Sequence, residues 1–122
     1  MKISILGTEY TITKKAFESD PDFTKKNIDG YCDPFLHQIV IGDLSTFPEW
    51  KNEEKERILV QEQASLRHEI VHAFLDESGL DCCALHFDDA WSKNEEMVDW
   101  IALMGPRIFK AWHEAGAFPT RV

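Results

Sequence analysis

The sequence predicts a small α+β domain, with strands in its first third and helices in the remainder. Apolar and polar residues alternate near the N-terminus, whereas apolar residues beyond Pro48 recur roughly every 3.6 positions. A chain of 122 residues is long enough for one compact domain and short of two ordinary ones. We therefore expect one domain over residues 1–122, in which a small, mostly antiparallel sheet packs on a long helix that is followed by a C-terminal helix or helix pair.

Three strands are expected in the first third of the chain. The segment KISILGTEYTI alternates apolar and polar residues around Gly7-Thr8, which predicts a short β-hairpin. HQIVIGDL, residues 37–44, is rich in β-branched residues and predicts a third strand that ends at Gly42-Asp43. Between them, residues 13–29 are charged and irregular, and Asp29-Gly30 is a turn signal. These strands should form the sheet.

Two helices are expected after the strands. The first runs from Pro48, which suits a first helical turn, to Gly79, which suits the position just after a helix, with a break considered near residue 60. The second is capped by Ser92 and ends near Gly116, and Gly105-Pro106 should kink it or split it in two.

Composition and charge exclude several classes of function. A net charge of −9 argues against a nucleic-acid partner, which needs clustered lysines and arginines. The sequence has no 18-residue apolar run and no signal-peptide pattern, so no membrane association is expected. The three cysteines are an odd number, and two are adjacent, which fits reduced thiols better than a disulfide framework. We therefore expect a soluble, cytoplasmic protein.

The motif HEIVH, residues 68–72, carries the clearest chemistry in the sequence. Residues four apart on a helix share a face, so His68 and His72 can both bind one Zn²⁺ at about 2.0–2.1 Å. Glu69 would stand beside a zinc-bound water, whose pKa the ion lowers to about 7, and would act as general base. Because such short motifs also occur by chance, a metal-free helical protein with incidental histidines is one alternative.

A zinc site of this kind needs a third protein ligand, and NEEMVD at residues 94–99 offers one. HExxH followed by N-E-x-x-x-D resembles the gluzincin metallopeptidases. The resemblance implies that Glu95 is the third ligand and that Asp99 orients His68. Glu95 and Asp99 share a helix face, and a ligating histidine normally donates its second N–H to a carboxylate.

Alternatives for the third ligand and for the oxyanion donor stay open. Ser92-x-x-Glu95 is also a capping-box pattern, in which Glu95 would bind the Ser92 backbone and Glu96 would be the ligand. His86 is a further candidate, because a third histidine follows HExxH in SprT-like zincins. A donor that stabilises the developing oxyanion is also needed, and the candidates are Tyr31, His86 and His113.

The order of strand, HExxH helix and Glu-bearing helix over residues 37–105 most resembles the small ImmA/IrrE-type metallopeptidases of phages and prophages. The resemblance implies a minimal zincin-like fold with one Zn²⁺ per chain, and an endopeptidase that acts in the bacterial host cytoplasm. It also implies that residues 37–44 form an edge strand that pairs with a peptide or protein substrate. The alternative is a zinc-containing, non-catalytic structural or interaction protein of phage or prophage origin. Cleavage specificity and oligomeric state do not follow from the sequence.

Overall fold

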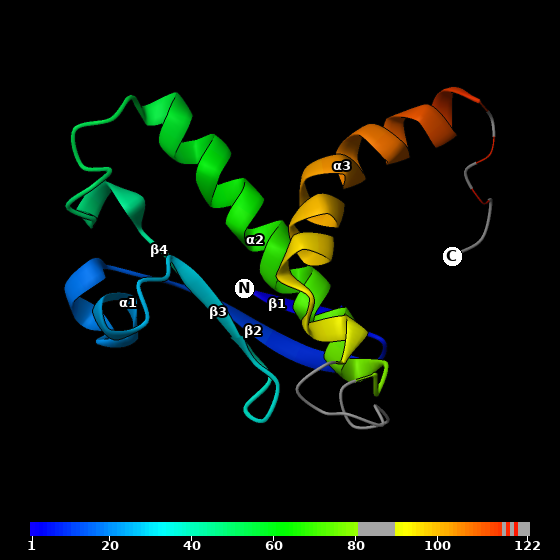
Figure 1. Ribbon diagram of the computed structural model, residues 1–122, viewed down its shortest axis with the longest axis horizontal. Coiled ribbons are helices and arrows are strands. Elements are labelled where there is room, and N and C mark those ends of the chain that lie inside the picture. Colours follow the sequence, from blue (N-terminus) through cyan, green and yellow to red (C-terminus); the bar gives the residue numbers. More distant parts are fainter. Residues whose placement is uncertain (81–89, 116, 118, 120–122) are drawn as a thin grey trace.

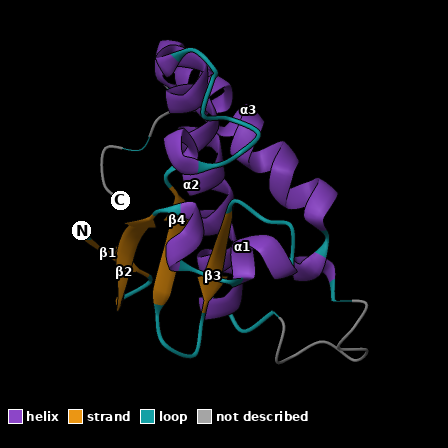
Figure 2. Ribbon diagram, turned by 90° about the vertical axis from the view of Figure 1, so that its left-hand side faces the viewer, coloured by secondary structure: helices purple, strands orange, loops and turns teal. Residues whose placement is uncertain are grey.

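A four-stranded sheet and a long helix packed on one of its faces form the centre of the fold (Figure 1). The computed structural model describes residues 1–80, 90–115, 117 and 119, and these confirm the expected α+β class. In Figure 2 the strands lie together on one side of the molecule. The elements are β1 (Lys2–Ile5), β2 (Thr8–Lys15), η1 (Phe17–Ser19), α1 (Asp22–Lys25), β3 (Gly30–Asp33), β4 (Gln38–Gly42), η2 (Leu44–Thr46), α2 (Lys55–Glu77), η4 (Trp91–Lys93) and α3 (Glu95–Glu114).

The sheet is mixed, with the strand order β1-β2-β4-β3. β1 and β2 form the expected antiparallel hairpin, and β3 and β4 are also antiparallel. The central pair, β2 and β4, is parallel, with Ile12 opposite Ile39. Two of the three strand pairings are thus antiparallel, as expected of a mostly antiparallel sheet, and the central pair is the exception. The chain crosses from β2 to β4 through η1, α1 and β3 instead of turning back directly, as a parallel pair requires.

β4 is an inner strand that is covered on both faces. Ile39 and Ile41 belong to the core cluster that includes Ala73 of α2. Val40 belongs to a second cluster with Phe23 of α1, on the opposite face of the sheet. The expectation that residues 37–44 form an edge strand is therefore wrong. The edge strand next to β4 is β3, which was not predicted from the sequence because its four residues begin with a glycine and follow a turn signal.

α2 runs unbroken from Lys55 to Glu77, without the break considered near residue 60. Pro48 lies in the turns that follow η2, so the helix begins later than expected. Gly79 has a φ of +76° and follows the C-cap residue Ser78, as expected for the glycine that ends a helix. α2 packs on the sheet through residues that include Ile70 of the HEIVH motif, and Glu69 of the motif lies beside Gly30 of β3.

α3 is a continuous helix that begins one residue after Asn94. The Asn94 side chain accepts a hydrogen bond from the Met97 backbone N–H at 2.9 Å, so Asn94 is the N-cap. The expectation that Ser92 caps this helix is wrong, because Ser92 lies in η4 and is buried. α3 ends at Glu114, and Gly116 lies outside the described residues. No helix in the described part of the chain is both long and apolar enough to cross a membrane.

Pro106 lies inside α3 and does not split it. Proline has no backbone N–H, so the carbonyl of Ala102, four residues earlier, loses its helical partner. The Nε of Arg67 on α2 donates to this carbonyl at 2.7 Å. In Figure 1 the axis of α3 changes direction along its length. The proline therefore bends the helix and leaves a carbonyl that joins α3 to α2.

Candidate metal centre

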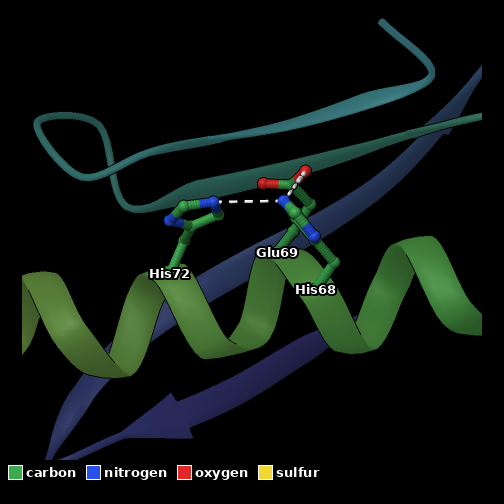
Figure 3. A group of neighbouring side chains, drawn as sticks. All are labelled: His68, Glu69 and His72. Carbon is green, nitrogen blue, oxygen red and sulfur yellow. Dashed lines mark hydrogen bonds and ion pairs between the residues drawn. The ribbon is translucent and has the colours of Figure 1, made fainter. Parts of the chain in front are cut away.

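His68 and His72 project from one side of α2 (Figure 3). Their Nε2 atoms are 3.1 Å apart, and each side chain is 20% exposed. The ring centroids are 4.8 Å apart with an interplanar angle of 65°. The two imidazoles are therefore partly buried and direct the same ring nitrogen at one point, as their spacing of four residues on a helix predicts.

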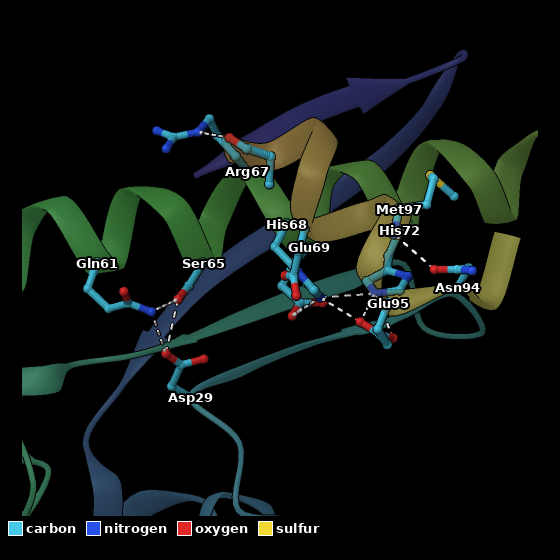
Figure 4. A network of polar contacts seen from close by, with 12 residues as sticks. Asp29, Gln61, Ser65, Arg67, His68, Glu69, His72, Asn94, Glu95 and Met97 are labelled. Carbon is cyan, nitrogen blue, oxygen red and sulfur yellow. Dashed lines mark hydrogen bonds and ion pairs between the residues drawn. The ribbon is translucent and has the colours of Figure 1, made fainter. Parts of the chain in front are cut away.

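Glu95, the first residue of α3, reaches both imidazoles (Figure 4). Its Oε2 atom lies 3.1 Å from Nε2 of His68 and 3.2 Å from Nε2 of His72. Asn94 caps α3 and thereby sets the start of the helix, so Glu95 is its first residue and not the third, the position that a capping box requires. Two helices thus bring three ligand atoms together.

These three atoms have the spacing that a zinc ion requires. A tetrahedral Zn²⁺ with bonds of about 2.0–2.1 Å holds its ligand atoms about 3.3–3.4 Å apart. The observed separations of 3.1, 3.1 and 3.2 Å are slightly shorter, so a small outward shift of the side chains would admit the ion. Two histidines and a glutamate are also a ligand set that catalytic zinc sites use.

Asp99 determines which nitrogen of His68 is free to bind a metal. The Asp99 Oδ1 atom lies 2.6 Å from Nδ1 of His68, so Nδ1 carries the proton and donates it to the carboxylate. In neutral His68 the lone pair then lies on Nε2, directed at the Glu95 carboxylate. In the tautomer of His72 that also presents its Nε2 lone pair, the converging lone pairs would repel one another, and a cation would relieve this repulsion. The arrangement therefore fits a metal ion.

Glu69 lies beside the three ligand atoms but is not placed as a fourth ligand. Its Oε1 atom is 3.9 Å from Nε2 of His68, beyond the separation expected for two ligands of one zinc ion. The residue is 7% exposed, and burial raises the pKa of its carboxyl to about 7, although the nearby His68 opposes the shift. A carboxyl with a pKa near neutrality can both accept and return a proton at physiological pH.

Edge strand β3 passes close to Glu69 at Gly30. A Cβ atom at Gly30 would lie 3.0 Å from the Val40 carbonyl oxygen and 3.7 Å from Cγ of Glu69. An open cavity of about 520 Å³ lies between this strand and the two helices, and its lining includes Gly30, His72 and Glu95. The candidate centre is therefore accessible along the free edge of the sheet.

The other residues considered from the sequence are not brought to this centre. Glu96 is exposed and has no ion pair with either imidazole within the described residues. His86 lies outside the described residues. His113 is at the far end of α3 from Glu95. Tyr31 lines the cavity beside the centre, but its hydroxyl donates to Asp20 at 2.5 Å and its ring packs with the core cluster on the opposite face of the sheet. None of the described candidates is therefore placed to stabilise an oxyanion.

Arg67 is a positioning residue that was not predicted from the sequence. It precedes His68 and binds the Ala102 carbonyl, so it fixes α3 beside the motif. The sequence does hold a signal for it, because Pro106 inside an amphipathic segment implies an unbonded carbonyl four residues earlier. Which donor reaches that carbonyl depends on the packing of two helices and cannot be predicted from spacing.

Comparison with known proteins assigns no family to the chain. No family model, curated protein or solved structure matches it. The function is therefore inferred from the geometry of the centre.

Proposed function

We propose that the protein is a zinc-dependent endopeptidase with a minimal zincin-like fold, of the gluzincin type and similar to the ImmA/IrrE-type enzymes of phages and prophages. One observation carries the proposal: Nε2 of His68, Nε2 of His72 and Oε2 of Glu95 form a triangle with sides of 3.1–3.2 Å. Three protein ligands leave one position open, which is typical of catalytic zinc sites, whereas structural sites are closed by four.

In this proposal His68, His72 and Glu95 hold one Zn²⁺ per chain. When bound, the ion would lower the pKa of a water molecule to about 7 and polarise the substrate carbonyl. Asp99 accepts the Nδ1 proton of His68 and so keeps the Nε2 lone pair directed at the centre.

Glu69 would carry the proton during hydrolysis. Its carboxylate would take a proton from the attacking water and then donate it to the nitrogen of the leaving amine. Burial raises the pKa of this group to about 7, close to the pH at which the reaction would run.

The substrate would bind along β3. This strand pairs with β4 on one side only, so its outer backbone groups are available to an extended peptide. Gly30 at its start lies over Glu69, so a peptide that pairs with the strand would pass the centre. The partner is thus a peptide or protein, and the free thiol of Cys32 is compatible with action in a reducing cytoplasm.

One observation favours the non-catalytic alternative. The ligand atoms come from two different helices, so a bound ion would also join α3 to α2. In that case zinc would contribute to stability without supporting turnover.

The Glu69→Gln variant separates these two functions. For an endopeptidase, Glu69→Gln should keep one zinc per chain and lose about 10²–10⁴-fold in hydrolysis of a peptide mixture, because no group then accepts the proton. Zinc content by elemental analysis and peptide cleavage by mass spectrometry measure the two properties. If zinc raises the melting temperature of the wild-type protein and that protein cleaves no peptide, the structural role is favoured.

A further inference from the structure

A larger cavity, of about 750 Å³, lies on the other side of Glu69 from the ligand triangle. It is lined by a stripe along α2 in which Gln61, Ser65 and Glu69 are spaced four residues apart. Helical rise places the two ends of this stripe about 12 Å apart along the axis. Glu69 and His68 line its inner end. A peptide whose backbone passes the metal centre could therefore place a side chain in this cavity.

The lining of this cavity combines aromatic rings with negative charge. The described residues that line it include no lysine and no arginine. Four aromatic residues contribute, of which Trp50 and Phe17 are partly exposed. Carboxylates are contributed by Asp29, Glu49, Glu69 and Asp99.

Asp29 is held against the α2 stripe by hydrogen bonds from two of its residues. Its Oδ2 atom accepts hydrogen bonds from Oγ of Ser65 at 3.1 Å and from Nε2 of Gln61 at 3.3 Å (Figure 4). Both donors are neutral, and no lysine or arginine of the described chain lies within 4.0 Å of this carboxylate. Two neutral donors orient the charge and do not neutralise it, so a cation from outside would gain from binding here.

We propose that this cavity binds an arginine side chain of the peptide substrate. The guanidinium group would donate to Asp29 and stack on the Trp50 ring, and the aliphatic part of the side chain would lie along the remaining apolar wall. Arginine suits the site better than lysine because its planar group can stack and bind a carboxylate at the same time. The inference rests on the proposed peptidase function, whose substrate class it names.

Binding and cleavage can be measured separately. The host for binding is the full-length, zinc-loaded Glu69→Gln protein, which should not cleave its ligand. Three blocked peptides that differ at one position, carrying arginine, citrulline or norleucine, are titrated by calorimetry. Citrulline has nearly the shape of arginine without its charge. The arginine peptide should bind about tenfold tighter than the citrulline peptide, as expected for a charged hydrogen bond.

Asp29→Asn should reduce the arginine-to-citrulline ratio to near one. The matched control is Asp22→Asn, which removes a nearby charge that does not line the cavity and should keep the ratio near ten. Trp50→Leu is a second variant that leaves Asp29 in place, and it should weaken binding of arginine more than that of norleucine. Circular dichroism and zinc content verify that each variant is folded.

The two proposals fail in distinguishable ways. Equal or tighter binding of norleucine, no binding of any of the peptides, or an arginine preference that survives Asp29→Asn would overturn the cavity assignment, even if the wild-type protein hydrolyses peptides. An arginine preference that depends on Asp29, in a protein that cleaves none of the three peptides in its wild-type form, would instead support the cavity and contradict the peptidase.

Discussion

The two helices that form the candidate metal centre are held in different ways. α2 packs on the sheet through a core cluster, and the side chains of His68 and His72 are each 20% exposed. The Glu95 and Asp99 side chains on α3 are 64% and 71% exposed. α3 buries two of its described residues and leaves large apolar side chains exposed at Trp100, Leu103, Phe109 and Trp112.

This difference divides the centre into a half held by the core and a half held by a few polar contacts. The core positions the two histidines and Glu69 whether or not a metal is bound. Glu95 is positioned by the Asn94 cap, by Asp99 and by the bond from Arg67. A metal ion would therefore contribute most to the order of α3, and four experiments can test this division.

The largest effect is expected from the buried carboxyl on the α2 side. Burial raises the pKa of Glu69 to about 7 in the folded protein, against 4.5 when it is unperturbed. The folded state thus favours the protonated form, and its stabilisation is fully present below about pH 4.5 and is lost as the pH rises through about 7. Metal-free Glu69→Gln should therefore be about 3 kcal/mol more stable than the wild type at pH 8, and this difference should vanish at pH 4.5.

Denaturant unfolding of both metal-free proteins at the two pH values measures this difference. The other carboxylates titrate in the same way in both proteins, so their contributions to the difference in stability cancel. A constant difference across this range would show that Glu69 is not desolvated as the structure indicates.

A matched pair of valines compares the two regions directly. Val40 is 1% exposed in the sheet core, and Val98 is 0% exposed on α3. Val40→Ala should lower the free energy of global unfolding by about 2 kcal/mol, since two buried methyl groups are lost. Val98→Ala should cost less global stability and instead lower the protection of α3 amides from hydrogen exchange. Equal global losses would mean that α3 unfolds together with the sheet.

Asp99→Ala should weaken zinc binding by about tenfold or somewhat more, because His68 loses the group that fixes its tautomer. Competition with a chromogenic chelator measures the affinity. Glu114→Ala removes a charge from the far end of the same helix and should leave the affinity unchanged. Unaltered affinity in Asp99→Ala would remove Asp99 from the centre.

The smallest effect is expected at Arg67. Arg67→Gln removes the bond to Ala102, worth about 1 kcal/mol, and should lower zinc affinity by about fivefold while leaving the sheet core intact. Arg57→Gln is the control on the same helix, because among the described residues Arg57 has only an exposed ion pair with Glu53. The same loss of zinc affinity in both variants would point to a general charge effect.

The division also explains which features could be predicted from the sequence. His68 and His72 are related by helical spacing alone, so local rules are enough to bring them together. The three consecutive buried residues Ile39, Val40 and Ile41 are typical of a strand covered on both faces, a signal that the sequence analysis treated as an edge strand. β3 could not be predicted, because its pairing depends on contacts with β4 and α2 rather than on its own four residues.

For α3, one residue of register decides which glutamate faces the histidines. Two cap residues were available, and Asn94 rather than Ser92 begins the helix. The sequence favoured Glu95 over Glu96 as the ligand because Glu95 has an acidic residue, Asp99, four positions later. The structure places Glu95 at the imidazoles. The contact from Arg67 to Ala102 joins residues 35 positions apart, and no local rule specifies it.

The most direct test of the centre is a comparison of zinc binding by Glu95→Gln and Glu96→Gln. The two variants remove the same charge from adjacent positions of α3, so they differ only in which carboxylate is lost. The wild-type protein and Glu96→Gln should bind one zinc per chain with the same affinity, whereas Glu95→Gln should bind it at least about 100-fold more weakly, because a ligand is lost. A wild-type protein that binds no zinc, or equal affinity in the two variants, would contradict the proposed centre.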